Sequence, residues 1–287
     1  MEKDKRIVCG IDIGGTNTRI AIIHAHTGAI LQFLDKFPTP QKYADQITAI
    51  TAVLQPWKLQ IGGVGVSIGG QVNPMGNSLR AAPNLPDYEN KPIREDLSGI
   101  LQTPVTIAHD PVCGGIAEIW SGALQDAERC AYLTISTGIG AAVFYHQADL
   151  QLNVSIQIGH QILYGNTRAC LCGQTGCIET YLGGKQAAIY AGKPLETISD
   201  PGFWRQYAEI LAIGVINTAQ LTRIETIAVA GSIAIHHPDV ITMANTIIKQ
   251  LLSDSSHVTL TPAFHGENAP LIGAARLLSS ETGAIIH

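Results

Sequence analysis

Residues 6–24 read RIVCGIDIGGTNTRIAIIH, two apolar stretches joined by a loop of glycine, threonine and asparagine. The stretches 6–13 and 19–24 are rich in β-branched residues, so each predicts a β-strand. A tight turn between two strands lets backbone N–H groups face a phosphate, because glycines put no side chains in the way. Asp12, at the end of the first strand, is suited to hold a magnesium ion through water, since this ion prefers oxygen ligands. Taken alone, the loop fits an ordinary hairpin turn equally well.

The loop matches neither of the two common phosphate-binding motifs. The Walker loop requires Lys followed by Ser or Thr and then a helix, and the Rossmann fingerprint also requires a helix, whereas a strand follows here. A second glycine turn, TGIGA at 137–141, lies between the expected strands 131–136 and 142–146, and AGS occurs at 230–232. Because the pattern occurs in both halves of the chain, nucleotide binding is a better interpretation than a simple hairpin.

Strands and helices alternate along the rest of the chain. Further strands are expected at 29–34, 61–70, 103–108 and 226–235 (the last running into a loop), and helices at 43–55 and 270–280. Three neighbouring strands followed by a helix and another strand predict a mixed sheet, so the expected fold class is α/β.

The composition limits the size, the location and the partners of the protein. With 287 residues, the chain is longer than one compact core usually holds, so two lobes are expected. Charged residues make up 14%, below the roughly 25% of soluble domains, which indicates a large buried fraction or a subunit interface. The net charge of −5, without a block of Lys and Arg, argues against nucleic acid as the main partner. No apolar run is long enough to predict a membrane span, and a reducing cytoplasm is the expected location.

Asp110 is the candidate catalytic base. It follows the expected strand 103–108 and precedes Pro111, and proline favours the first turn of a helix. An Asp at this position is commonly a helix cap, and this interpretation is favoured by the sequence alone. The functional alternative is that its carboxylate accepts a proton from a substrate hydroxyl that attacks a phosphoryl group.

Three of the six cysteines lie close together in the segment CLCGQTGC, residues 170–177, and His160 precedes it. Cys170, Cys172, Cys177 and His160 form the Cys₃His set of a closed structural zinc site. A reactive cysteine is the less favoured alternative, since three thiols and a histidine gather here. Two other groups are expected to play no part: Cys9, Cys113 and Cys130 are interpreted as core residues, and His24, His26, His236, His237 and His265 as surface or loop residues.

Together these segments resemble the ROK family of sugar kinases, within the actin-like ATPase superfamily. The matching motifs keep the family order nearly end to end: DIGGTNT (12–18), GVGVSIGGQVNP (63–74), PNLP (83–86), HD (109–110), STGIGA (136–141), QIGH (157–160), CLCGQTGCIET (170–180), AGS (230–232) and LIGAARL (271–277). The CxCGxxGCxE block with its upstream Gly-His is the most specific of them.

The resemblance implies an α/β, two-lobed ribonuclease H-like (actin-like ATPase) fold with a cleft between lobes that holds ATP. The N-terminal lobe is expected over 1–110, with a C-terminal helix at 272–287 that packs back on it. The C-terminal lobe, with the zinc loop, is expected over 111–271. The implied activity is ATP-dependent phosphorylation of a hexose or N-acetylhexosamine at the 6-hydroxyl, of the glucokinase or N-acetylmannosamine kinase type. The implied cofactors are ATP, Mg²⁺ and structural Zn²⁺.

The resemblance also assigns roles to individual residues. Asp110 matches the catalytic base of the family. The residues implied to bind the nucleotide and its magnesium are Asp12, Gly14, Gly15, Thr16, Asn17, Thr137, Gly138, Gly140, Gly231 and Ser232. Those implied to bind the sugar are Gly70, Asn84, His109, Asp110, Gln157, His160 and Glu179. The zinc is expected to perform no chemistry but to fix the positions of His160 and of the loop that leads to Glu179.

Two positions depart from the family pattern. His109 stands where the family usually has Asn, and Gln157 stands where it usually has Glu. Hydrogen bonds to a carboxylate contribute about 1.5–3 kcal/mol, against about 0.5–1.5 for a neutral amide, so the sugar affinity is expected to fall at least tenfold or the preferred hydroxyl pattern to differ. Because a histidine changes its charge between about pH 5 and 8, kcat/KM is expected to fall below about pH 6.5.

Several alternatives remain open within the family. A catalytically weak sugar sensor would explain the two changed positions, although Asp110 is retained, and a fructokinase is a further alternative. Family repressors carry a helix-turn-helix domain ahead of the kinase lobes, and the start of DIGGTNT at residue 12 is expected to leave no room for one. GGQVNP (69–74) is similar to the corresponding loop of N-acylmannosamine kinases, whereas the rest fits glucokinase-like members equally well. The expected partners are a small sugar and a second copy of the chain, as a homodimer or homotetramer.

Overall fold

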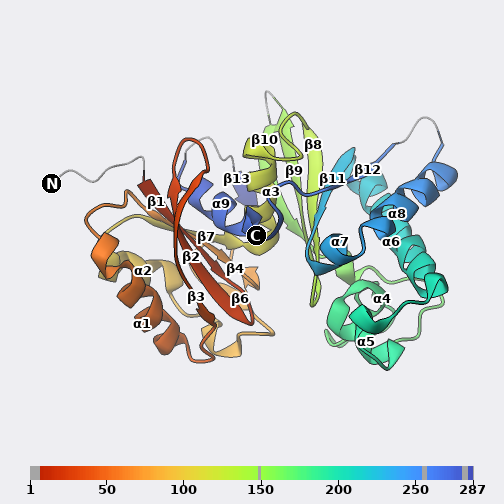
Figure 1. Ribbon diagram of the computed structural model, residues 1–287, viewed down its shortest axis with the longest axis horizontal. Coiled ribbons are helices and arrows are strands. Elements are labelled where there is room, and N and C mark those ends of the chain that lie inside the picture. The colour runs from red at the N-terminus through yellow and green to blue at the C-terminus, as the bar shows by residue number, and fades with distance from the viewer. Residues whose placement is uncertain (1–6, 148–149, 254–256, 280–283, 287) are drawn as a thin grey trace. The chain divides into compact units, whose positions relative to one another are not determined.

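The structure is a computed structural model, and it describes residues 7–147, 150–253, 257–279 and 284–286 (Figure 1). Contacts between Cα atoms divide the chain into two compact units. The first contains residues 1–121, 151–154 and 268–287, and the second contains residues 122–150 and 155–267.

The first unit is built on a mixed five-stranded sheet. The strand order is β3 (Ile30–Pro38), β2 (Asn17–His24), β1 (Ile7–Ile13), β4 (Val64–Ile68) and β7 (Val105–His109). β1, β2 and β3 pair antiparallel, whereas β1, β4 and β7 pair parallel. The predicted mixed sheet is therefore confirmed, and the glycine loop is the β1–β2 turn.

The alternation of side chains along β1 and β4 decides what covers each face of this sheet. Cys9, Ile11 and Ile13 share a core with α1 (Tyr43–Leu54) and α2 (Ile93–Leu101). On the opposite face, Val8 packs against Leu271 and Ala275 of α9 (Ala269–Arg276). A Cβ at Gly65 of β4 would overlap the carbonyl of Ala274 in α9, so glycine lets the helix approach the sheet closely.

The C-terminal helix covers this sheet together with α3 (Asp110–Ser121). α9 and α3 touch along their backbones, because a Cβ at Gly273 would overlap the carbonyl of Cys113. This contact places α3 with the first unit, whereas the sequence analysis began the second lobe at residue 111.

The C-terminal helix is shorter than the predicted helix 272–287. α9 ends at Arg276, and Ala284–Ile286 form strand β13, parallel to β10 (Leu150–Ile156). The prediction of helix at 284–286 is therefore wrong, and residues 280–283 and 287 lie outside the described chain. The β-branched Ile285 and Ile286 favour a strand.

The second unit also contains a mixed sheet. Within this unit its order is β12 (Thr259–Pro262), β11 (Thr226–Ala230), β8 (Arg129–Ile135) and β9 (Ile139–Gln147). β8 and β11 are parallel, and β8 and β9 are antiparallel around the second glycine turn. Two long helices, α6 (Pro201–Thr222) and α8 (Pro238–Leu251), pack against each other. Short elements complete the chain: β5 (Gln71–Val72), β6 (Leu79–Ala81), α4 (Glu179–Leu182), α5 (Gly184–Ala191) and α7 (Ser232–His236).

None of the helices in the described part of the chain combines the length and the apolar character that crossing a bilayer requires.

Candidate functional site

The ends of three parallel strands bring the acidic candidates of the first unit together. In the sheet register Asp12 of β1 pairs with Ser67 of β4, and Ile68 of β4 pairs with His109 of β7. Asp110 follows at once as the first residue of α3. Ligands of open α/β sheets bind outside the carboxyl ends of the strands, which is where these side chains lie.

Asp12 is held by two neighbours. Arg19 Nη2 lies 2.7 Å from its Oδ2 atom, and Ser67 Oγ donates to its Oδ1 atom at 3.0 Å. Burial raises the pKa of Asp12 above its usual range, Arg19 lowers it in part, and the nearby Asp110 raises it again. Two neighbouring carboxylates with one guanidinium are a suitable environment for a hydrated divalent cation, so these residues fit the expected magnesium.

Asp110 is the more open of the two acids. Its side chain is 37% exposed, against 14% for Asp12. His109, which is 13% exposed, places its Nε2 atom 3.0 Å from the Asp110 carboxylate. The carboxylate also lies at the N-terminus of a helix, where the macrodipole favours negative charge. Asp110 is thus an accessible carboxylate with one basic neighbour.

The first glycine turn lies beside a predicted sugar ligand. Its backbone is closed by a hydrogen bond from Gly14 N to Asn17 O at 3.0 Å. A Cβ at Gly15 would come within 2.8 Å of the Cβ atom of Asn84, so the loop and Asn84 are in contact. Gly70, at φ +136°, has a backbone conformation that other residues rarely adopt. The structure therefore brings Gly14–Asn17 and Asn84 together in the first unit.

The second glycine turn and the Gly231–Ser232 pair meet at the ends of β8 and β11. Ser136 Oγ lies 3.2 Å from Ser232 Oγ. Gly231 has φ +93°, and a Cβ there would overlap the backbone of Ile135. Sequence reasoning placed the turn and the pair with the nucleotide, and the structure brings them side by side.

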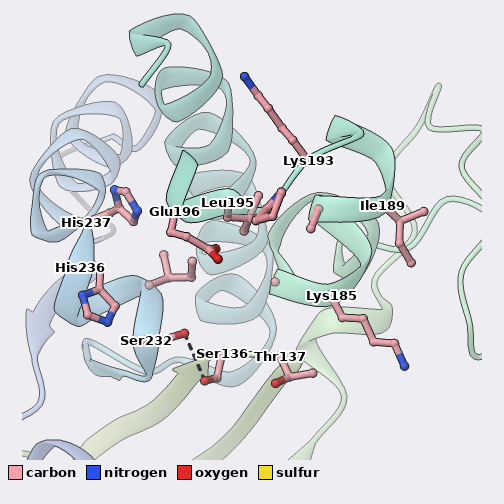
Figure 2. Close-up of a pocket in the computed structure, with 14 residues that line it drawn as sticks. Ser136, Thr137, Lys185, Ile189, Lys193, Leu195, Glu196, Ser232, His236 and His237 are labelled. Carbon is pink, nitrogen blue, oxygen red and sulfur yellow. Dashed lines mark hydrogen bonds between the residues drawn. The ribbon is translucent and has the colours of Figure 1, made fainter. Parts of the chain in front are cut away.

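Ser136, Thr137 and Ser232 form one wall of a pocket of about 780 Å³ within the second unit. It is lined by Ser136, Thr137, Gly184, Lys185, Ala188, Ile189, Lys193, Pro194, Leu195, Glu196, Ser232, Ile233, His236 and His237. Figure 2 shows Glu196 pointing toward the middle of this group, whereas Lys185 and Lys193 point outward. Lys185, Lys193 and Glu196 were not among the predicted site residues, and His236 and His237 were expected only as surface or loop residues. No short motif marks them, because they are spread over residues 185–237 and only the fold brings them together.

Glu179 is the buried acid of the second unit. It is 8% exposed, and its two carboxylate oxygens accept from the backbone N–H of Ile139 at 3.3 and 3.2 Å. Cβ atoms at Gly138, Gly159 or Gly183 would all overlap this carboxylate. Burial raises the pKa of Glu179 to about 7, although the Ile139 hydrogen bond lowers it. The glycines therefore enclose a carboxylate that is tied to the second glycine turn.

His160, Cys170, Cys172 and Cys177 gather as predicted. Their candidate ligand atoms all lie within 4.8 Å of one another. Cys172 Sγ and Cys177 Sγ are 3.7 Å apart, and His160 Nδ1 is 4.0 Å from Cys170 Sγ. Two sulfurs bound to one tetrahedral zinc at about 2.3 Å would be about 3.8 Å apart. The donor set and its spacing therefore fit a zinc ion, with Nδ1 as the histidine ligand.

The thiols of this cluster differ in acidity. Burial acts to raise the pKa of Cys170, but hydrogen bonds from the Cys172 backbone and from Gln186 bring it below its usual value. Burial and the neighbouring cysteines raise the pKa of Cys177 to about 12. A divalent ion would deprotonate all three thiols, because thiolates are the binding form.

The QIGH segment links these features. Gln157 is exposed and precedes the 3₁₀ turn Ile158–His160. Gly159 lies against the Glu179 carboxylate, and His160 joins the cysteines. The predicted sugar ligands thus fall into two groups, with Gly70, Asn84, His109 and Asp110 in the first unit and Gln157, His160 and Glu179 in the second.

Comparison with known proteins decides the family. The model of the ROK family matches residues 8–281. The chain belongs to the ROK family. Its fold is that of the ROK actin-like ATPases, an α/β fold of two lobes.

Three relatives show how far the likeness extends. N-acetyl-D-glucosamine kinase of Escherichia coli (strain K12) is 26% identical over 300 residues, which cover 93% of this chain and 98% of the relative. The ROK family glucokinase from Streptomyces griseus, in complex with glucose and AMPPNP, has a TM-score of 0.79 at 21% identity, covering 94% of this chain and 98% of that one. The ROK hexokinase from Thermus thermophilus has a TM-score of 0.77 at 24% identity, covering 94% and 97%.

Proposed function

We propose that this ATP-dependent sugar kinase phosphorylates the 6-hydroxyl of an N-acetylhexosamine or, as a second choice, of a hexose. The observation that carries the proposal is the open Asp110 carboxylate beside Asp12 at the ends of the parallel strands. The preference for an N-acetylhexosamine is supported by the near full-length match to an N-acetyl-D-glucosamine kinase.

In the proposed reaction the Asp110 carboxylate accepts the proton of the 6-hydroxyl. The sugar oxygen then forms a bond to the γ-phosphorus of ATP, and the bond from that phosphorus to the bridging oxygen of ADP breaks. Backbone N–H groups of Gly14–Asn17 and Thr137–Gly140 would hold the phosphates. Magnesium, held through water by Asp12, would supply positive charge to the phosphates.

The pocket of the second unit is the proposed place of the nucleoside. It is continuous with Thr137 and Ser232, and its volume of about 780 Å³ is in the range of roughly 300–1,000 Å³ typical of small-molecule sites. The Glu196 carboxylate, which points to its middle, is suited to accept hydrogen bonds from ribose hydroxyls or an amino group of the base (Figure 2).

Glu179 and His160 are the proposed sugar ligands of the second unit. The His160 Nδ1 atom faces Cys170, which leaves its Nε2 atom for a sugar hydroxyl. A zinc ion on Nδ1 would fix both the tautomer and the ring orientation of His160. His109 and Gln157, which replace residues that usually bind the sugar in this family, are the proposed determinants of sugar choice.

The proposal is tested by ADP release across a panel of N-acetylglucosamine, N-acetylmannosamine, glucose, mannose and fructose, run beside Asp110→Asn. We expect sugar-dependent release that is fastest with an N-acetylhexosamine, and a product that carries its phosphate on O6 by ³¹P–¹H NMR. Removing the base should lower kcat by about 10²–10⁴-fold. If wild type and Asp110→Asn are equally silent while sugars still raise the Tm, the protein is a sugar sensor and the kinase proposal is wrong.

A further inference from the structure

Helix α5 connects the cysteine cluster to the proposed nucleotide pocket. On one face it carries Gln186 and Tyr190, which are one helical turn apart. Gln186 Nε2 donates to Cys170 Sγ at 3.4 Å, and Gln186 Oε1 accepts from Leu171 N at 3.1 Å. Tyr190 OH donates to the carbonyl of Ala169 at 2.8 Å. This face of the helix therefore holds the first part of the zinc loop.

The rest of α5 belongs to the pocket. Lys185, Ala188 and Ile189 line it. The start of the helix is tied to the second glycine turn by hydrogen bonds from Gly184 N to Ser136 O at 2.8 Å and from Lys185 N to Thr137 O at 2.9 Å. A Cβ at Gly184 would come within 2.5 Å of the Ser136 carbonyl, so the helix and the turn are in direct contact. One short helix thus lines the pocket and is bonded to the Ser136–Thr137 turn that forms another of its walls.

Gln186 is the point where the two sets of contacts join. Its side chain is buried, at 6% exposed, and both ends of its amide are used on the zinc loop. An amide N–H that donates to a metal-bound thiolate orients the ligand and offsets part of its charge. Since an eight-residue helix is stabilised mainly by its packing, a change at Cys170 has a direct route to Lys185 and Ile189.

We propose that Gln186 is a positioning residue that couples the metal site to nucleotide affinity. With zinc on Cys170, the Gln186 amide fixes α5, and α5 holds the pocket and the Ser136–Thr137 turn in the form that binds the nucleotide. Loss of the metal or of the amide releases α5 and weakens nucleotide binding in the absence of any sugar. The nucleotide half of this inference rests on the proposed function, whereas the zinc half does not.

The coupling has a reciprocal consequence. If zinc raises the affinity for a nucleotide by some factor, the nucleotide must raise the affinity for zinc by the same factor. Coupling factors between sites are typically about 5–150-fold. Partners of metal ligands typically affect metal affinity by about 10–100-fold.

The experiment uses the full chain with zinc bound and compares three substitutions. Gln186→Glu keeps an acceptor for Leu171 N but puts a negative oxygen beside the thiolates, and Gln186→Met keeps the size and removes both hydrogen bonds. Gln174→Glu is the matched control, because it makes the same change at an exposed side chain of the same loop. Zinc affinity is measured by competition with a chromogenic chelator, with and without saturating ADP, and ADP affinity is measured by calorimetry without sugar.

For both Gln186 variants we expect at least tenfold weaker zinc binding and about fivefold or weaker ADP binding, with wild-type values for Gln174→Glu. Zinc-stripped wild type should bind ADP as weakly as Gln186→Met, and ADP should raise the zinc affinity of wild type but not of that variant. Circular dichroism and Tm separate these effects from loss of folding.

Each remaining outcome contradicts a defined part of the inference. Unchanged zinc affinity in both Gln186 variants overturns the role of Gln186. Weaker zinc binding with unchanged ADP binding overturns the coupling. If zinc-loaded wild type binds no nucleotide at all, the proposed function fails, and with it the coupling, while the zinc titration still decides whether Gln186 supports the metal site.

Discussion

The two halves of the candidate site are held in different ways. In the first unit, Asp12, Ser67 and His109 are placed by the register of three paired strands, and Asp110 by the helix that follows. In the second unit, His160 and the three cysteines come from a segment with little regular structure. Apart from the 3₁₀ turn Ile158–His160, its described backbone contains two isolated bridges, Ile162 with Cys177 and Ala169 with Thr175.

The difference indicates what each half requires. Backbone ladders fix the first set of side chains without any bound ion, because strand pairing satisfies the main chain by itself. The second set depends on four ligands that must be held close together. Metal binding supplies the free energy that holds them there. Damage to the metal site should therefore affect the second half of the site and spare the first.

Removal of the zinc tests this comparison most strongly. The zinc is removed with a selective chelator, and magnesium is then added back. We expect kcat/KM to fall by about 100-fold or more, because a 1 Å displacement of a positioning group can lower the rate that much. Hydrogen exchange should accelerate at residues 158–178 and stay unchanged in β1, β4 and β7. Zinc, but not magnesium, should restore the activity. Faster exchange in the first sheet would show that the two halves are not independent.

Gly159→Ala provides a smaller and more local test. The added methyl group would overlap the Glu179 carboxylate and displace a proposed sugar ligand without touching the cysteines. We expect the KM for the sugar to rise about 10-fold or more, as for loss of a charged hydrogen bond, and the free energy of unfolding to fall by about 1–3 kcal/mol.

Gly99→Ala is the control for this substitution. Gly99 lies in α2 with no atom within 4 Å of an added Cβ, so the change should stabilise the helix by about 0.5–1 kcal/mol and leave the KM unchanged. An unchanged KM in Gly159→Ala would show that Glu179 does not contact the sugar.

The same contrast explains what the sequence could predict. The strands around the glycine turns, the mixed sheet and the cysteine cluster follow from local patterns of alternation, turn residues and ligand types. The pocket residues Lys193, Glu196 and His236 could not be found, because only tertiary packing brings their elements together. No sequence motif marks Gln186 either, because its role depends on which face of α5 contacts Cys170.

The strand β13 shows the limit for a short terminal segment. Its three residues carry too little pattern to outweigh the helical periodicity of LIGAARL before them. The assignment of Asp110 shows the opposite case. Residue chemistry alone favoured a helix cap, and only the family resemblance favoured a base.

The contact between His109 and Asp110 allows a test within the first half of the site. The fall of kcat/KM expected below about pH 6.5 is assigned to this contact, in which His109 Nε2 lies 3.0 Å from the Asp110 carboxylate. Burial also raises the pKa of Glu179 to about 7, so part of the fall should come from the second half. We expect the fall in kcat/KM between pH 8 and 5.5 to be several-fold smaller in His109→Asn than in wild type. The part of the fall that comes from Glu179 should remain. Superimposable profiles for wild type and His109→Asn would contradict a role for this contact.

The smallest expected effect is on the chemical reactivity of the six cysteine thiols. Their labelling distinguishes thiols that a metal protects from thiols that burial protects. Burial raises the pKa of Cys130 to about 12 and raises those of Cys9 and Cys113 further, so these thiols should stay protonated and unreactive at pH 8. After zinc removal, iodoacetamide should modify Cys172 first, because it is the exposed cysteine of the cluster. Mass spectrometry of the native protein should find Cys9, Cys113 and Cys130 unmodified with or without zinc. Labelling of Cys113, which lies in α3 just after Asp110, would mean that the loss of metal also opens the first unit, and the two halves of the site would then have to be treated as one cooperative structure.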